Sequence, residues 1–127
     1  METNDYICAA EWKAFLMAPR FRVIYSDEVL SFLKTLNGKA RKKILFNINK
    51  SKYVIDETLF KKLSGTDFWE FRTSYGKQSY RIFAFWDEQD TALVITTHGF
   101  VKKKQKTPMK EINRATSIKH AYYSNKQ

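Results

Sequence analysis

The stretch from residue 63 to residue 108 limits most strongly what this chain can fold into. It contains three runs rich in aromatic and β-branched residues, separated by two short polar breaks at residues 75–77 and 87–90. Breaks of this length are typical of β-hairpins, and such side chains suit the packed faces of a sheet. The pattern therefore predicts an antiparallel meander of three strands. The side chains that carry this pattern are Trp69, Phe71, Ile82, Phe83, Phe85, Val94 and Ile95.

The residues before the meander predict a short strand and two helices. Residues 21–25 alternate in the manner of a strand, and Ser26 or Asp27 is suited to cap the helix that follows. The Asn-Gly pair at residues 37–38 is expected to end this helix. A second helix is predicted over residues 39–51. Its inward-facing side chains are predicted to be Ile44, Leu45 and Ile48.

The rest of the chain completes the predicted architecture. Residues 53–60 are expected to connect the second helix to the meander. After the meander, Thr107 is suited to cap a helix and Pro108 to occupy its first turn, and helical spacing continues over residues 109–122. The order predicts an α+β fold: an antiparallel sheet built from a short N-terminal strand and the meander, a helical hairpin packed on one face, and a C-terminal helix. With the helices on one side, the other face would remain partly open to a polar ligand.

A chain of 127 residues fits a single domain. We expect this domain to cover residues 21–127 and residues 1–20 to form an N-terminal extension. Two interpretations of the extension remain open: a segment that precedes a natural start at Met17, or an ordered addition that packs on the sheet. One cysteine permits no internal disulfide, and together with two histidines it supplies no metal-ligand set. We therefore expect no cofactor, no metal and a cytoplasmic location.

The net charge of +10 is the strongest clue from composition. Between residue 98 and residue 127, eight lysines and arginines stand against one acid, Glu111. A charge concentrated in this way indicates a polyanionic partner, and nucleic acid is favoured over a membrane because no strongly amphipathic basic helix with an aromatic face is evident. A solvated basic surface that only maintains solubility is the simpler alternative.

Two arginines of the meander are candidates for phosphate binding. Strand alternation places Glu70 and Arg72 on the face opposite the packed aromatic side chains. If the first hairpin turns on residues 76–77, Arg81 lies directly opposite Arg72, whereas a three-residue turn would break this pairing. Two guanidinium groups suit a phosphodiester because each offers a planar, bidentate donor pair. The alternative is that Arg72 only pairs with a neighbouring carboxylate.

Several separate pieces of this region together resemble the RelE/ParE toxin superfamily, in particular its HigB-like, phage-derived branch. The first piece is Leu63-x-Gly65-x-x-x-Trp69-Glu70-x-Arg72, the second is Tyr80-Arg81-Ile82, and the third is His98-Gly99-Phe100-x-Lys102-Lys103-x-x-Lys106-Thr107-Pro108. They occur in the order that the superfamily shows, and the resemblance covers residues 21–123. It implies a RelE-like fold and the toxin of a type II toxin–antitoxin system.

The resemblance also implies a metal-independent endoribonuclease that cleaves mRNA on the ribosome and so inhibits translation. Fixed positive groups would stabilise the charge that builds on the phosphoryl oxygens. By resemblance, phosphate contact and transition-state stabilisation fall to Arg72, Arg81, Lys102 and Lys103. Further contacts to RNA are expected from Glu70, Tyr75, Lys77, Tyr80, Lys104 and Lys106.

The general base stays open at this point. RelE has a tyrosine early in its C-terminal segment, but residues 106–109 of this chain read Lys-Thr-Pro-Met. His98 is chemically the best substitute because the unperturbed pKa of histidine lies near 6.5. The other candidates are Glu70, Tyr75 and Tyr80, and His98 is equally suited to a structural hydrogen bond at a strand end.

The resemblance implies as partners mRNA, the ribosome and a cognate helix-turn-helix antitoxin of the HigA-like kind, and no membrane. Two other functions remain open. One is a non-enzymatic, ParE-like toxin that inhibits DNA gyrase, and the other is a nucleic-acid-binding module without activity. Retention of the basic set at residues 72, 81, 102 and 103 favours RNA cleavage.

Overall fold

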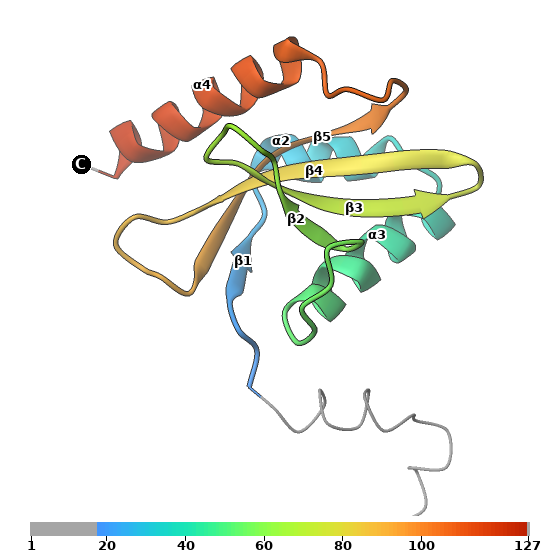
Figure 1. The fold of residues 1–127 in the computed structure, drawn as a ribbon, viewed down its shortest axis with the longest axis horizontal. Coiled ribbons are helices and arrows are strands. Elements are labelled where there is room, and N and C mark those ends of the chain that lie inside the picture. The colour runs from blue at the N-terminus through green and yellow to red at the C-terminus, as the bar shows by residue number, and fades with distance from the viewer. Residues whose placement is uncertain (1–17, 127) are drawn as a thin grey trace, which may run out of the picture.

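A twisted mixed sheet forms the centre of the protein (Figure 1). The computed structural model describes residues 18–126, so the extension predicted over residues 1–20 lies outside the described residues except for its last three. The sheet has five strands in the order β1-β5-β4-β3-β2. Their bounds are β1 (Arg22–Ile24), β2 (Phe60–Lys62), β3 (Trp69–Tyr75), β4 (Gln78–Trp86) and β5 (Leu93–Lys102). The predicted α+β architecture and its three-stranded meander are confirmed.

The sheet differs from the prediction at its two edges. β1 pairs with β5 in parallel, so the sheet is mixed rather than antiparallel throughout. β2 is a fifth strand in a segment that was predicted to be mainly a connection, and it pairs with β3. Its three residues, one phenylalanine and two lysines, are too few to show an alternating pattern. Stacking of Phe60 on Phe71, with ring centroids 4.3 Å apart, holds this edge against the core.

A two-residue turn joins β3 to β4 and fixes their register. Tyr75 pairs with Gln78, and the two residues between them, Gly76 and Lys77, both have positive φ, at 59° and 67°. Positive φ at both central positions is the type I′ geometry, which matches the twist of the flanking strands. The register that follows places Arg72 directly opposite Arg81, as predicted for this turn length.

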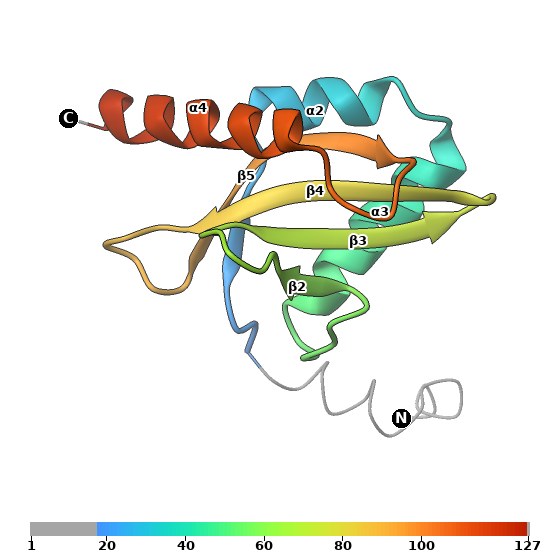
Figure 2. The same ribbon diagram turned by 45° about the horizontal axis from the view of Figure 1, so that its top comes forward.

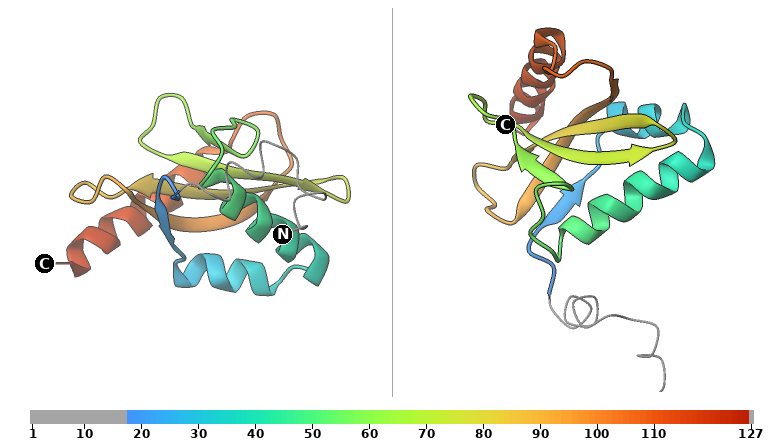
Figure 3. Two further views of the ribbon diagram at one scale, coloured as in Figure 1. Left: turned by 90° about the horizontal axis from the view of Figure 1, so that it is seen from below. Right: turned by 45° about the vertical axis from the view of Figure 1, so that its right-hand side comes forward.

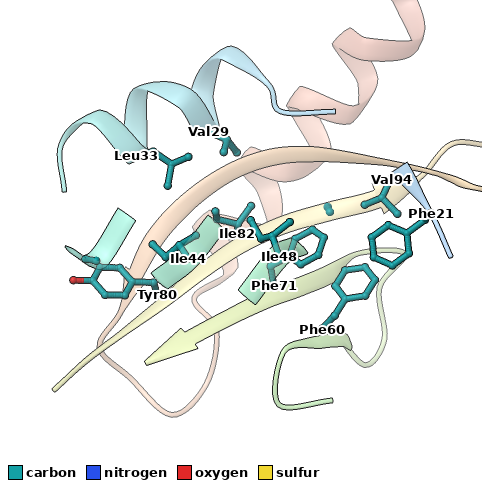
Figure 4. Close-up of a cluster of buried hydrophobic side chains, with 12 residues drawn as sticks. Phe21, Val29, Leu33, Ile44, Ile48, Phe60, Phe71, Tyr80, Ile82 and Val94 are labelled. Carbon is teal, nitrogen blue, oxygen red and sulfur yellow. The ribbon is translucent and has the colours of Figure 1, made fainter. Parts of the chain in front are cut away.

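Helices α2 (Asp27–Lys34) and α3 (Gly38–Ser51) cover one face of the sheet (Figure 4). The Ser26 side chain caps α2 by accepting a hydrogen bond from the backbone N of Val29. Asn37 was expected to end α2; instead, its side chain accepts from the backbone N of Ala40 and so begins α3. The apolar side chains that this layer encloses include Val29, Leu33, Ile44, Ile48, Phe71, Ile82 and Val94.

Two details of these elements correct the sequence-based prediction. Leu45 was expected to face inward, but it is 38% exposed because it lies one position beyond Ile44 on a helix whose buried side is narrow. Thr107 was expected to cap the C-terminal helix, but Pro108 occupies the N-cap position and no side chain caps the helix there.

The C-terminal helix α4 (Met109–Asn125) lies on the opposite face of the sheet from α2 and α3 (Figures 2 and 3). Helices on one side only were therefore a wrong prediction. The reason lies in β4, where Ile82 and Ala84 belong to one core layer while Phe83 and Phe85 belong to the other. A strand that is apolar on both faces needs cover on both. α4 covers only part of its face. Among the described residues, no helix is both long and apolar enough to cross a membrane.

Asp87, in the loop between β4 and β5, holds the C-terminal end of α4. Its buried carboxylate accepts hydrogen bonds from the Tyr122 hydroxyl at 2.7 Å and from Lys126 Nζ at 2.9 Å. It also accepts from the backbone N of Gln89 and Asp90. These donors, the Tyr122 hydroxyl first, hold the pKa of Asp87 well below its usual range.

We predict that Asp87→Asn destabilises the protein by about 2 kcal/mol at pH 7, because several hydrogen bonds to a buried charge are lost or weakened. The folded-state pKa is depressed, so the contribution is fully present above the unfolded value near 4 and is lost as the pH falls toward the folded value. Urea unfolding of both proteins between pH 7 and pH 2.5 measures this difference. Glu88→Gln changes an exposed neighbouring carboxylate and serves as the control. A difference in unfolding free energy between Asp87→Asn and the unchanged protein that stays constant from pH 7 to pH 2.5 would contradict the prediction.

Candidate functional site

Arg72 and Arg81 lie side by side on the face of the sheet that α4 leaves partly open. They are direct cross-strand partners in β3 and β4, so their side chains leave the same face. Arg81 is only 7% exposed, while Arg72 is partly buried. Two like charges at a cross-strand pair repel each other, and this arrangement is unfavourable without an anion between them. The pair is therefore suited to bind a negatively charged group.

Glu70 is buried beside Arg81 on the same face. One of its carboxylate oxygens, Oε2, lies 3.7 Å from Arg81 Nε, which attracts the two charges but is too long for a hydrogen bond. Oε2 of Glu70, Nε of Arg72 and Nε of Arg81 are all buried and lack a hydrogen-bond partner within the described residues. Buried polar atoms are normally paired, and unpaired ones point to a functional site. Nη1 of Arg72 donates to the Glu57 carbonyl oxygen at 3.4 Å and Nη1 of Arg81 donates to the Tyr80 carbonyl oxygen at 3.0 Å, while the Nε of each arginine stays unpaired among the described residues.

Lys102, at the end of β5, adds a further positive charge to the two arginines. It pairs in register with Ser79, two positions from Arg81 along β4, and therefore leaves the same face as Arg81. Burial lowers the pKa of Lys102, and the charges of Arg81, Arg72 and Lys61 lower it further, while Glu70 opposes the change. The pKa of Arg81 is lowered by burial first and then by Arg72, again against Glu70. The strand register crowds these positive charges on one face of the sheet, and Arg81 is almost fully buried there.

The positive region continues from β5 toward α4. A pocket of about 350 Å³ opens between the end of β5 and the start of α4. Its lining includes Phe100, Lys102, Lys103, Lys104 and Lys110. Lys106 lies outside this pocket and lines a neighbouring one of about 380 Å³ together with Lys104. An extended anion that reaches from the arginine pair past Lys102 would meet these lysines next.

The structure does not bring the two predicted tyrosines to this cluster. Tyr80 is 7% exposed and packs in the core under α2 and α3, on the face opposite Arg81. Tyr75 packs against the same core layer. Lys77 is exposed in the turn at the far end of the β3–β4 hairpin. Strand alternation explains these positions, since Tyr80 precedes Arg81 and Tyr75 is an odd number of residues from Arg72.

His98 is fully buried beneath α4 and holds the start of this helix to the sheet. Its Nε2 lies 3.1 Å from Oε1 of Glu111 in α4, and its Nδ1 lies 3.1 Å from Oγ1 of Thr97. The ring also packs between Phe83 and Phe100. Burial lowers the pKa of His98 below its usual value, against the opposing effect of Glu111. His98 has no exposed surface in this structure and lies apart from the arginine pair, and its two ring nitrogens both have protein partners.

Two neighbours of the cluster were not predicted from the sequence. Lys61 pairs with Glu70 across β2 and β3, and it was missed because the strand that carries it was missed. Glu111 was noted only as the single acid of the C-terminal segment, and its contact with His98 depends on α4 packing across the sheet. Within residues 18–126, histidine, cysteine, aspartate and glutamate side chains nowhere gather in a group of three or more that would suit a metal ion.

The model of the family described as "Phage derived protein Gp49-like (DUF891)" matches residues 31–120. The match spans more than half of the chain. The chain belongs to this family. The matched range includes the arginine pair, the lysines at the end of β5 and most of α4. No curated protein matches the sequence.

Among solved structures, the fold resembles that of a double arginine mutant of E. coli toxin RelE in the free state. The TM-score is 0.55 at 13% sequence identity, and the alignment covers 79% of this chain and 97% of that chain. The intact E. coli RelBE toxin–antitoxin complex also contains a similar chain, with a TM-score of 0.47, 15% identity and coverage of 68% and 99%. The match to the RelE mutant shows that this family member has a RelE-like fold.

We predict that Arg72→Met raises the stability of the free protein by about 0.5–1 kcal/mol, because it removes the like-charge partner of Arg81 and keeps an unbranched apolar stem. It should also abolish the stabilisation that inorganic phosphate gives to the unchanged protein. Thermal unfolding with and without phosphate measures both effects. Lys34→Met changes an exposed cation of α2 and serves as the control. A lower melting temperature for Arg72→Met, with phosphate stabilisation retained, would show that the pair is structural.

Proposed function

We propose that this protein is the toxin of a type II toxin–antitoxin system and that it acts as an endoribonuclease on mRNA. The observation that carries the proposal is the cross-strand pair of Arg72 and Arg81, whose buried Nε atoms have no partner among the described residues. The RelE-like fold supports the toxin assignment, since the similar solved structure is that of a toxin. We place the protein in the HigB-like branch on the sequence resemblance given above.

The two arginines suit the phosphate at which RNA would be cut. In this reaction the ribose 2′-oxygen attacks the adjacent phosphorus, a 2′,3′-cyclic phosphate forms, and the bond to the 5′-oxygen of the next nucleotide breaks. Negative charge builds on the non-bridging oxygens, and guanidinium groups held at fixed positions stabilise it. Removing one such donor typically lowers the rate by roughly 10²–10³. The buried carboxylate of Glu70 lies beside Arg81 and acts as a positioning residue for its guanidinium.

Lys102 is the candidate proton donor for the leaving 5′-oxygen. It lies on the same face as Arg81, and its pKa is lowered mainly by burial, which makes its ammonium group a stronger acid than an exposed lysine. The proton of the attacking 2′-hydroxyl passes to water, and the proton of Lys102 passes to the 5′-oxygen, so the reaction balances. Lys103 and Lys104, which line the adjacent pocket, are assigned to the backbone of the same RNA strand.

The main experiment is induction of the protein in bacteria, followed by growth measurement and mapping of transcript ends. We expect growth arrest with new ends inside translated codons, and loss of both in Arg72→Ala/Arg81→Ala because the phosphate site is removed. A matched control with two cations changed elsewhere, Arg22→Ala/Lys34→Ala, should remain toxic. Arrest with intact transcripts would overturn the ribonuclease proposal in favour of a binding inhibitor, such as one that acts on DNA gyrase.

A second prediction separates the proton-donor role of Lys102 from its charge. Lys102→Arg keeps the positive charge but replaces the group with one that does not release a proton near neutral pH. We expect it to lower the cleavage rate roughly 10²-fold, nearly as much as Lys102→Met, while RNA binding by Lys102→Arg stays close to that of the unchanged protein. Cleavage kinetics and binding measured between pH 6 and pH 9 test this. Full activity in Lys102→Arg would reduce the role of Lys102 to electrostatics.

The same positive surface is the proposed target of a cognate helix-turn-helix antitoxin of the HigA-like kind. From residue 98 to residue 127 the chain carries eight lysines and arginines against one acid. An antitoxin that places acidic residues on it would occupy the RNA site and silence the toxin. Ribosomal mRNA and such an antitoxin would then compete for one surface.

A further inference from the structure

The exposed side of α3 carries a line of positive charge that the proposed cleavage site does not use. Lys39, Lys43 and Lys50 are separated by four and seven residues, and Phe46 lies between the last two. At 3.6 residues per turn, all four fall on one narrow stripe of the helix. All four are exposed, and Lys42 flanks the stripe. We call these five residues the α3 stripe.

The α3 stripe is unusual in its charge. α3 contains five lysines and arginines and no aspartate or glutamate. Among the described residues, no ion pair involves a lysine of the stripe. Like charges at this spacing destabilise a helix, and α3 also lacks acids in its first turn, where they would be favourable. Packing of the buried side of α3 on the sheet must therefore offset this charge repulsion. A polyanion bound to the stripe would neutralise the lysines and remove the repulsion.

Phe46 makes the stripe more than a solvated face. It is 61% exposed, and Lys43 Nζ lies 5.7 Å from the centre of its ring. An aromatic ring among lysines is a typical surface for nucleic acid, because the cations meet phosphates and the ring meets a sugar or a base. The stripe has one exposed aromatic side chain and is otherwise polar, so it lacks the broad apolar face that a membrane-bound helix needs.

The α3 stripe lies on the other side of the sheet from the arginine pair. α3 packs beneath β3, where Asn47 donates a hydrogen bond to Oγ1 of Thr73 at 3.1 Å. Arg72, the neighbour of Thr73, points to the opposite face. An RNA strand bound at the arginine pair would therefore leave the stripe free. The two positive surfaces therefore lie on opposite faces of the sheet.

We propose that the α3 stripe is a docking surface for structured RNA, which positions the protein while a different, single-stranded segment enters the arginine site. This inference rests on the proposed function, because it assumes that the substrate is presented by a larger RNA assembly. From Lys39 to Lys50 the stripe extends over roughly 16 Å, enough to meet several phosphates of one helix. Contacts of this kind give affinity and orientation without reading sequence.

The test uses full-length protein carrying Arg72→Ala, so that no cleavage occurs, and a fluorescent 20-base-pair RNA duplex as the probe. Adding Lys39→Gln/Lys43→Gln/Lys50→Gln should weaken duplex binding by roughly tenfold or more and reduce the slope of log affinity against log salt by about 2–3. A control with the same net charge, Arg22→Gln/Lys34→Gln/Lys119→Gln, should change both far less. Equal losses in the two variants would overturn the proposal, since net charge alone would then explain them.

Phe46→Gln gives an independent measurement. It should weaken duplex binding several-fold at every salt concentration and leave the salt slope unchanged, because no charge is lost. An acidic protein is the alternative occupant, and a fluorescent polyglutamate peptide represents it. Loss of polyglutamate binding with unchanged duplex binding in the triple variant would overturn RNA in favour of a protein partner. These readouts do not depend on cleavage, so failure of the ribonuclease proposal would be seen separately, in the transcript assay.

Discussion

The structure depends on the pairing of β4 with strands on both sides while both of its faces are apolar. Ile82 and Ala84 enter the layer beneath α2 and α3, and Phe83 and Phe85 enter the layer beneath α4. Each layer needs its own helical cover, and the chain supplies one from before the meander and one from after it. Arg81 belongs to this same strand and faces the α4 side. The cluster is therefore fixed by the most constrained element of the fold.

The cluster is built at some cost to stability. Two arginines are held as cross-strand neighbours, a third cation approaches from β5, and the single carboxylate beside them is not hydrogen-bonded to Arg81. The sheet holds these side chains in place because their backbone positions are set by the two-residue turn and by strand pairing. Charges held in this way need little rearrangement when an anion arrives, which is the condition for strong electrostatic stabilisation of a transition state. This face is a candidate site because strand pairing holds like charges together against their mutual repulsion.

Much of this arrangement was predictable from the sequence because local signals were strong. The turn residues at positions 76 and 77 fixed the hairpin register, and strand alternation then placed Arg72 opposite Arg81. The larger missed features depend on contacts between distant segments. β2 has only three residues and exists because β3 offers it an edge. His98 has the chemistry of a general base, but α4 covers it and Glu111 contacts its ring.

The division of the apolar β4 side chains between the two faces of the sheet was also not predictable from the sequence. The apolar run in β4 was evident, but its division between two layers required knowing which helix covers which face. Lys102, Lys103 and Lys104 were predicted individually, but the pocket that they line together with Phe100 and Lys110 depends on where the loop after β5 returns to α4. Propensity and spacing describe neighbours in the chain, whereas these contacts are set by the whole fold.

The attachment of α4 at both of its ends has a consequence for how this protein opens. One contact joins Glu111 to His98 near the start of the helix, and the other joins Tyr122 and Lys126 to Asp87 near its end. Loss of either contact alone frays one end and leaves the other in place. Full detachment requires the loss of both contacts and of the apolar packing of α4 between them. The aromatic layer of Phe83 and Phe85 therefore stays covered when only one end of α4 opens.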